Sequence, residues 1–159
     1  MKKFIIALIV LLVLSAGWYF LAPLVFDKKV NEDFPTENTT NQNNKNNNPA
    51  EQSIISQGEF IGADNFHQGS GVATVYKLND NSLVLRFEDF NVTNGPDLRV
   101  ILAKDPDNIK AGYIEIDKLK GNIGNQNYSL ESNLNLTEYP YVVIYCKPFA
   151  VTFASALLN

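Results

Sequence analysis

Apolar and polar positions divide the chain into three stretches. Residues Phe4 to Phe26 carry no charge and follow Lys2 and Lys3, residues 27–52 are polar and rich in asparagine, and residues 53–159 mix β-branched, aromatic and turn-forming side chains. The last stretch is long enough for one domain with its own core. The pattern therefore predicts an N-terminal apolar segment, a linker and a single globular domain.

The N-terminal apolar segment is long enough to cross a bilayer. At about 1.5 Å of rise per residue, a helix over Phe4–Phe26 matches a hydrocarbon core of roughly 30 Å. A cleaved secretory signal is the alternative, for which Ser15-Ala16-Gly17 offers only a weak cleavage site. Because the apolar run continues through Trp18, we expect an uncleaved signal-anchor over residues 1–26. We therefore expect a single-pass membrane protein with its C-terminal domain outside the cytoplasm.

Residues 27–52 have almost no apolar side chains with which to offset the entropy cost of an ordered backbone. Asparagine-rich tracts form β aggregates in some proteins, but a stalk between an anchor and a domain is the simpler interpretation. We therefore expect residues 27–52 to be a disordered Asn-rich linker.

The pattern of residues 53–159 is that of short strands. Leu83 to Glu88 and Leu98 to Leu102 alternate at the two-residue period of a strand, and Val72 to Lys77 forms a further strand. A final pair, Tyr141 to Cys146 and Phe149 to Phe153, is joined by a Lys-Pro turn. This succession, with no long helical period, predicts an all-β domain, an antiparallel two-sheet β-sandwich of jelly-roll type.

Charge and glycine positions narrow the functional classes. The formal net charge is -4 at pH 7, and the basic residues of the domain are interspersed with acidic ones, so we expect no nucleic-acid partner. Gly121 and Gly124 lack the strand-to-helix setting of a phosphate-binding loop. We interpret them as turn positions that need a permissive backbone.

Cys146 is the only cysteine, and it closes the strand that begins at Tyr141. Alternation places Val142, Ile144 and Cys146 on one aliphatic face, where burial would raise the pKa of the thiol and suppress its reactivity. The end of the strand beside Lys147 also allows a rim position, where an ammonium group favours the thiolate. Structural packing, a redox or ligand role, and an intermolecular disulfide all stay open.

His67 is the only histidine and lies in a glycine-rich stretch. It could ligate haem, carry protons or partner the thiol of Cys146, and the alternative is a local hydrogen-bonding role in a loop. A single histidine, a single cysteine and a sole methionine at Met1 exclude a blue-copper site and a structural zinc site. No serine lies in a recognisable nucleophile elbow, so no catalytic residue is expected and the question of enzymatic activity stays open.

A series of short segments across residues 53–159 is similar, in order, to the DM-thirteen domain family. The series begins with Gly58-Glu59-Phe60 and ends with Val143-Ile144-Tyr145-Cys146 followed by Phe149, Phe153 and Ala156. Between these lie Phe66-His67-Gln68-Gly69-Ser70-Gly71, Leu85-Arg86-Phe87, Asn94-Gly95-Pro96-Asp97-Leu98, and Leu119-Lys120-Gly121-Asn122-Ile123-Gly124-Asn125-Gln126-Asn127-Tyr128.

The resemblance implies a β-sandwich found beside membrane anchors, with a shared cysteine that Cys146 matches. It also implies electron transfer, either by the bare thiol or through a bound group such as haem, with another membrane redox protein as electron partner. We therefore expect a membrane-anchored extracytoplasmic redox module in which Cys146, with or without His67, is the functional residue. The alternative is a noncatalytic cell-envelope binding or adhesion β-sandwich in which the cysteine is structural.

Overall fold

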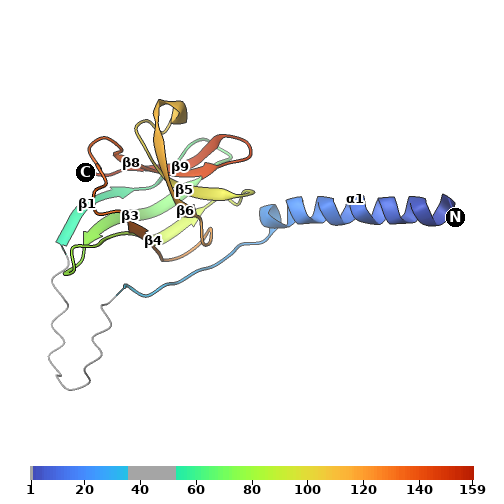
Figure 1. Cartoon of the computed structure of the whole chain (residues 1–159), viewed down its shortest axis with the longest axis horizontal. Coiled ribbons are helices and arrows are strands. Elements are labelled where there is room, and N and C mark those ends of the chain that lie inside the picture. Colours follow the sequence, from blue (N-terminus) through green and yellow to red (C-terminus); the bar gives the residue numbers. More distant parts are fainter. Residues whose placement is uncertain (1, 36–52) are drawn as a thin grey trace, which may run out of the picture.

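A computed structural model describes residues 2–35 and 53–159 of the chain (Figure 1). Its described elements are one long helix, a set of strands and one short 3-10 helix. In chain order they are α1 (Lys2–Val25), β1 (Ser53–Glu59), β2 (Ile61–Gly62), β3 (Gly69–Lys77), β4 (Leu83–Val92), β5 (Leu98–Ala103), η1 (Ile109–Ala111), β6 (Tyr113–Lys118), β7 (Gln126–Leu130), β8 (Tyr141–Cys146) and β9 (Val151–Leu157).

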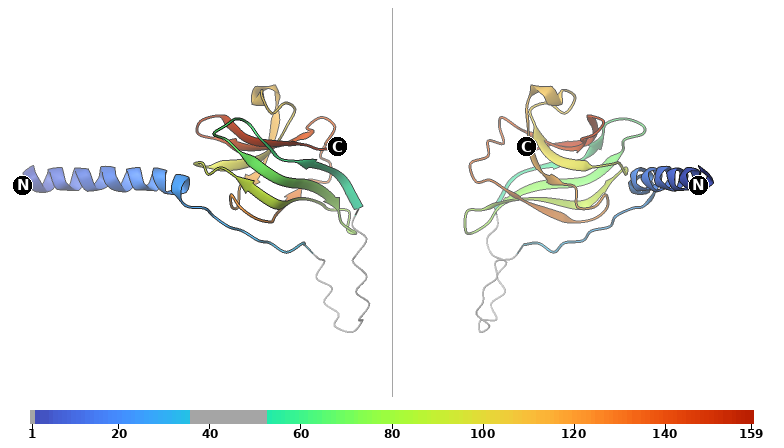
Figure 2. Two further views of the ribbon diagram at one scale, coloured as in Figure 1. Left: turned by 180° about the vertical axis from the view of Figure 1, so that it is seen from behind. Right: turned by 45° about the vertical axis from the view of Figure 1, so that its right-hand side comes forward.

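The strands form two antiparallel sheets that lie face to face (Figure 2). One sheet has the strand order β1-β3-β4-β7, and the other has the order β2-β9-β8-β5-β6. Every strand pair is antiparallel. The predicted all-β, two-sheet sandwich is confirmed, whereas the jelly-roll subtype stays a prediction.

Aromatic side chains fill the space between the sheets. The ring of Phe87 lies 4.9 Å from that of Phe60, 5.0 Å from that of Phe90 and 5.2 Å from that of Tyr128, measured between centroids. All four side chains are buried. Such edge-to-face and tilted contacts add to the stabilisation from burial alone.

The strands predicted from alternation are confirmed at β4, β5 and β8, but the last strand begins later than predicted. Lys147 to Ala150 form a turn, in which Ala150 adopts a φ of 54°, and β9 therefore starts at Val151 and runs to Leu157. Strands β1, β2, β6 and β7 were not predicted; in β7 the inward positions are Gln126, Tyr128 and Leu130. A buried glutamine at the first inward position hides the alternation.

Helix α1 covers Lys2–Val25, and its side chains are described without a gap from residue 3 to residue 12. Within the part of the chain that the structure describes, no helix is both long and apolar enough to cross a membrane. The predicted membrane-spanning helix over Phe4–Phe26 is therefore not supported by the described residues.

Residues 27–35, which we call the strap, differ from the predicted disordered linker because they lie along the sandwich. The amide of Val30 donates to the carbonyl of Ile123 at 2.9 Å, and the amide of Glu32 donates to the carbonyl of Asn125 at 2.9 Å. Lys29 also forms a parallel bridge with Ile123. These partners are distant in sequence, so local composition cannot reveal them. Residues 36–52 of the predicted linker lie outside the described residues.

Two glycines allow the strap to approach the domain closely. A Cβ on Gly121 would collide with the carbonyl oxygen of Lys28 and would lie 2.7 Å from a methyl group of Val30. A Cβ on Gly124 would collide with the carbonyl oxygen of Val30, and Gly124 also has a φ of +101°. The interpretation as permissive turn positions fits Gly124, but at Gly121 the reason for glycine is the close approach of the strap.

Side chains fasten the strap to the outer face of the four-stranded sheet. The ammonium group of Lys120 lies 2.9 and 3.0 Å from the two carboxylate oxygens of Glu32, and the amide of Asn127 donates to the same carboxylate at 2.8 Å. The ring of Phe34 packs edge-on against Tyr76 at 4.9 Å, and the guanidinium of Arg86 lies 5.6 Å from its centre. Because the strap covers this part of the sheet, Arg86 is only 6% exposed although it faces outward from β4.

Candidate functional site

Cys146 lies at the end of β8 in the interior of the sandwich. In the register of its sheet it pairs with Leu98 of β5 and Val151 of β9. Val142, Ile144 and Cys146 all have 0% exposure and belong to the core between the sheets. The predicted shared face of these three residues is confirmed, and the thiol has no direct contact with solvent.

The Sγ–H of Cys146 donates to the carbonyl oxygen of Pro96 at 3.1 Å. Burial raises the pKa of the Cys146 thiol; a hydrogen bond from the Phe149 amide lowers it in part, and the carboxylate of Asp97 raises it further. A thiol with a raised pKa stays protonated at neutral pH, so it lacks the thiolate character of a reactive cysteine.

Lys147 does not supply the activating charge that its sequence position suggested. Its ammonium group pairs with Glu115 at 2.8 Å, and its side chain is 48% exposed. Glu115 also pairs with Arg99 at 2.8 Å, and Arg99 in turn donates to both carboxylate oxygens of Asp97. The charges at this end of β5, β6 and β8 neutralise one another at the surface, above the buried sulfur.

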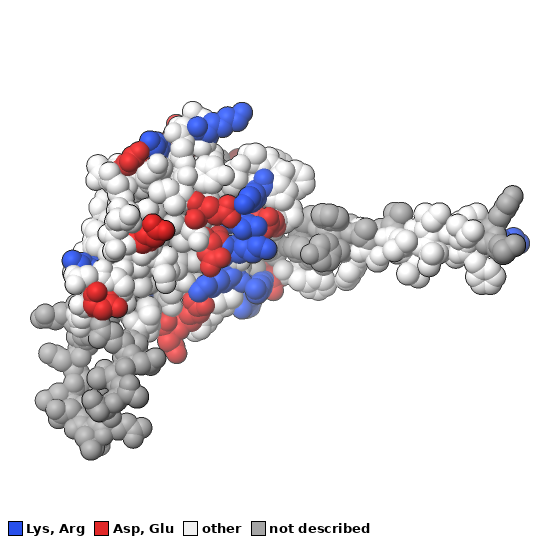
Figure 3. Space-filling view, in the orientation of Figure 1, with Lys and Arg blue, Asp and Glu red and all other residues white. Residues whose placement is uncertain are grey.

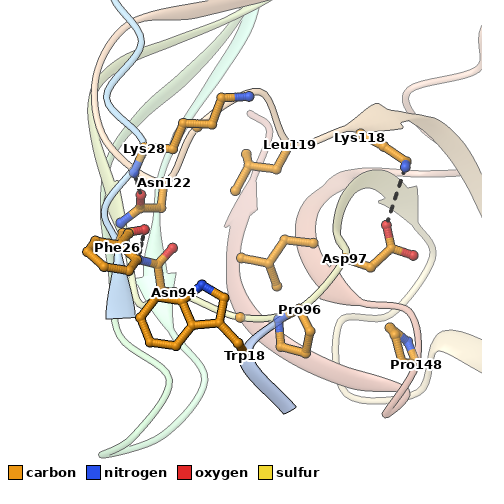
Figure 4. Close-up of a pocket in the computed structure, with 13 residues that line it drawn as sticks. Trp18, Phe26, Lys28, Asn94, Pro96, Asp97, Lys118, Leu119, Asn122 and Pro148 are labelled. Carbon is orange, nitrogen blue, oxygen red and sulfur yellow. Dashed lines mark hydrogen bonds and ion pairs between the residues drawn. The ribbon is translucent and has the colours of Figure 1, made fainter. Parts of the chain in front are cut away.

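Pro96 links the thiol to a surface cavity. This cavity of about 840 Å³ lies where the end of α1 meets the sandwich, and we call it the junction cavity (Figure 4). Trp18 and Phe26 line it on the helix side, and Pro96 and Pro148 line it on the sandwich side. Its remaining lining residues are Lys28, Asn94, Gly95, Asp97, Leu98, Lys118, Leu119, Gly121 and Asn122. Cys146 itself does not line the cavity but lies behind its Pro96 wall.

His67 lies in a separate turn and has its own partners. Its Nδ1 is 2.7 Å from a carboxylate oxygen of Asp64, and its ring packs 4.3 Å from the ring of Phe153. The Asp64 carboxylate also accepts hydrogen bonds from the amides of Phe66 at 2.7 Å and His67 at 2.8 Å. The hydrogen bond from the His67 side chain, followed by these amide bonds, lowers the pKa of Asp64 to about 2.

The structure does not bring Cys146 and His67 together as partners. Cys146 bonds to Pro96, whereas His67 bonds to Asp64, and no hydrogen bond or ion pair joins the two in the described residues. The contacts of His67 are those of the alternative interpretation, in which the ring organises a loop. Its redox or ligand role stays a prediction.

The junction cavity does not fit a haem group. Haem iron needs an axial ligand such as histidine, cysteine, methionine or tyrosine, and the lining of the junction cavity contains none of these. His67 does not line the junction cavity, and Cys146 is separated from it by Pro96. Among residues 2–35 and 53–159, no cluster of three or more metal-ligating side chains occurs either.

The fold and the site define the class of protein: a two-sheet antiparallel sandwich with one buried thiol beneath a surface cavity. The family model described as electron transfer DM13 matches residues 59–158. The chain therefore belongs to this family, which confirms the resemblance found in the sequence. Comparisons with curated proteins and with solved structures found no match.

Proposed function

We propose that the chain is a membrane-anchored, extracytoplasmic electron-transfer module whose redox group is the thiol of Cys146. Membership of the electron transfer DM13 family supports the electron-transfer role. The role of the thiol is supported by its position next to the junction cavity. Its Sγ is hydrogen-bonded at 3.1 Å to Pro96, which lines that cavity.

The raised pKa of Cys146 determines how such a thiol exchanges electrons. Because the protonated form dominates, a one-electron oxidation turns the thiol into a thiyl radical and releases its proton, so the electron and the proton pass together to one acceptor. This acceptor is a hydrogen-atom acceptor of the quinone or organic-radical class, seated in the junction cavity or on its rim and supplied by a small molecule or a partner protein. Burial protects the sulfur from uncontrolled disulfide formation.

The membrane part of the proposal rests on the sequence of the N-terminal segment. Phe4 to Phe26 carry no charge, and the apolar residues are distributed around α1 instead of lying along one face. A helix that is apolar all round is typical of a membrane span or of a protein interior. The described side chains of α1 are largely exposed, Phe4 for example by 81%, so a protein interior does not cover them.

A second candidate function has one specific observation in its favour. With 0% exposure and membership of the main core, Cys146 is also placed as a purely structural residue. In that case the sandwich is a noncatalytic binding module of the cell envelope, and the thiol only fills space.

The test compares the full chain with its Cys146→Ala variant, with His67→Ala as the matched control. Purified anaerobically in detergent, each protein is titrated with a mild one-electron oxidant while the free thiol is counted. We expect the wild type and His67→Ala to donate electrons with loss of the thiol signal, and Cys146→Ala to donate none. If wild type and Cys146→Ala behave alike and the thiol reacts only after denaturation, the binding module is the correct function.

Membrane attachment is measured separately in cells. We expect the full chain to stay in the membrane fraction after extraction with alkaline carbonate, and a cysteine-free chain with Asn159→Cys to react with an impermeant thiol reagent from outside. Release by carbonate or protection of position 159 would contradict the proposed anchoring.

A further inference from the structure

One end of the sandwich is held directly against the end of helix α1. The side chain of Asn94 donates to the carbonyl oxygen of Phe26 at 2.9 Å and to the carboxylate of Asp27 at 3.1 Å. The side chain of Asn122 also donates to Asp27, at 2.9 Å. Since α1 ends at Val25, no spacer separates the helix from the domain (Figure 1).

The strap holds this arrangement in place. Its hydrogen bonds and the ion pair of Glu32 with Lys120 begin within a few residues of the end of α1. The domain is therefore not at the end of a free stalk. The end of the sandwich that faces the helix is formed by the turn 64–67, the loop 94–97 and the turn 147–150, and we call it the anchor-proximal end.

Two phenylalanine side chains project from the anchor-proximal end. Phe66 is 83% exposed and Phe149 is 68% exposed. Phe66 lines a second surface cavity together with Asp27 and Asn94, and Phe149 follows Pro148 of the junction cavity, so both turns lie beside the helix end. Large exposed aromatic groups are unfavourable in water, and two of them at one end of a domain are typical of an interaction surface.

Both phenyl rings are carried on ordered turns. Asp64 fixes the first turn through hydrogen bonds from the amides of Phe66 and His67 at 2.7 and 2.8 Å. Ala150 closes the second turn with a φ of 54°. Because the backbone is already held in place, burying either ring in a partner costs little additional conformational entropy.

The balance of acidic and basic side chains near the anchor-proximal end favours binding of a bilayer through apolar contacts. Lys118 is 69% exposed and Lys147 is 48% exposed, but Asp97 and Glu115 accompany them. Figure 3 shows the acidic and basic side chains intermixed on the part of the domain beside the helix. Such a balanced surface tolerates zwitterionic headgroups and gives no strong preference for anionic lipid.

We propose that the anchor-proximal end is a bilayer-docking face, in which Phe66 and Phe149 insert into the interfacial region of the membrane. This inference rests on the proposed membrane anchoring, which brings the face to a bilayer. Aromatic side chains are favoured at the boundary between headgroups and acyl chains. The junction cavity, and with it the Pro96 wall over Cys146, then opens at the membrane surface, where amphiphilic molecules partition from the lipid.

The test uses the full chain reconstituted in phosphatidylcholine vesicles. Trp18 is first replaced by phenylalanine, and a single tryptophan is then placed by Phe66→Trp or Phe149→Trp. Ile54→Trp is the matched control, because Ile54 is 58% exposed at the start of β1, on the side of the sandwich away from α1 (Figure 1). Lipids brominated near the headgroup quench tryptophan fluorescence only at short range.

We expect brominated lipid to reduce the emission of the Phe66→Trp and Phe149→Trp variants at least twofold and to leave that of the Ile54→Trp variant unchanged. Adding Gly121→Ala, which displaces the strap, should weaken the quenching. Co-flotation of the protein with the vesicles and absence of quenching would overturn the docking face, and a protein partner would then be its occupant. Failure of the protein to float with the vesicles would overturn the anchoring and the docking together. Neither result depends on the redox behaviour of Cys146.

Discussion

Glu32 and Lys120 are 88 residues apart in sequence, yet the ammonium group of Lys120 lies 2.9 and 3.0 Å from the two carboxylate oxygens of Glu32. Partial burial by itself raises the pKa of Glu32. The hydrogen bonds from Lys120 and the Asn127 amide, with the charges of Lys120 and Arg86, more than offset that effect and hold the pKa below its usual value. The ion pair therefore couples the docking of the strap to pH.

The first prediction concerns this pH dependence. Because the pKa of Glu32 is lower in the folded chain, its contribution to docking is fully present above the usual value of 4.5 and is lost as the pH falls through the lowered value. We expect Glu32→Gln to weaken docking by about 1 kcal/mol at neutral pH and to remove most of the acid dependence. Amide hydrogen exchange at Val30 measures docking from pH 7 to pH 3. An unchanged acid dependence in the variant would contradict the coupling.

Gly121 offers a steric test of the same contact. The three atoms nearest to a Cβ at this position all belong to the strap, namely two backbone atoms of Lys28 and a side-chain methyl of Val30, so Gly121→Ala should displace the strap and leave the sandwich folded. We expect at least a tenfold rise in the rate of proteolysis between residues 27 and 35. Gly17→Ala is the control, because a Cβ at Gly17 would meet no atom within 4 Å. Equal cleavage rates in the two variants would show that the close contact at Gly121 does not hold the strap in place.

Cys146 allows a third prediction, about stability. Replacing a fully buried thiol by alanine leaves a small cavity and removes the bond to Pro96, so Cys146→Ala should lose about 1 kcal/mol of unfolding free energy. The pKa of the thiol is raised on folding, so its protonated form contributes stability below the usual value of 9.0, and this is lost as the pH rises through the folded pKa. Denaturant unfolding at pH 7 and pH 10 should therefore show a smaller difference between the two proteins at pH 10. A difference that grows with pH would mean that the thiolate is the favoured form.

Asp64 and His67 provide a fourth prediction. Above a pH of about 2 the Asp64 carboxylate accepts the hydrogen bonds that order the turn carrying Phe66, and it loses them as the pH falls through that value. In His67→Ala the largest of these contributions is removed. We expect the carboxyl resonance of Asp64 to titrate near 2 in the wild type and closer to the usual value of 3.8 in the variant. The same midpoint in both proteins would show that the amides alone set the pKa.

The sandwich could be predicted from the sequence because apolar side chains recur at every second position in its core strands. Leu83, Leu85 and Phe87 alternate with their neighbours and are all buried as that pattern requires, and the same holds for Val142, Ile144 and Cys146. The single cysteine was likewise found from the sequence, together with the effect of burial on its pKa. These features depend on residues that are close together in the chain.

The strap and the junction cavity could not be predicted, because each depends on contacts between distant residues. Nothing in the composition of residues 27–35 shows that Glu32 has a partner at Lys120 or that Phe34 covers Tyr76. The spacing of Gly121 and Gly124 was the one available signal, since two glycines near one another mark the close approach of a second backbone. Lys147 was misjudged for the same reason, because its partner Glu115 lies on another strand.

The position of the strap decides what the length of the asparagine-rich tract can influence. Phe34 of the strap packs against Tyr76 of the sandwich and β1 begins at Ser53 in the same sandwich, so both flanks of the tract are held on one domain. The tract can therefore expand or contract between relatives without altering how far the thiol lies from the N-terminal helix.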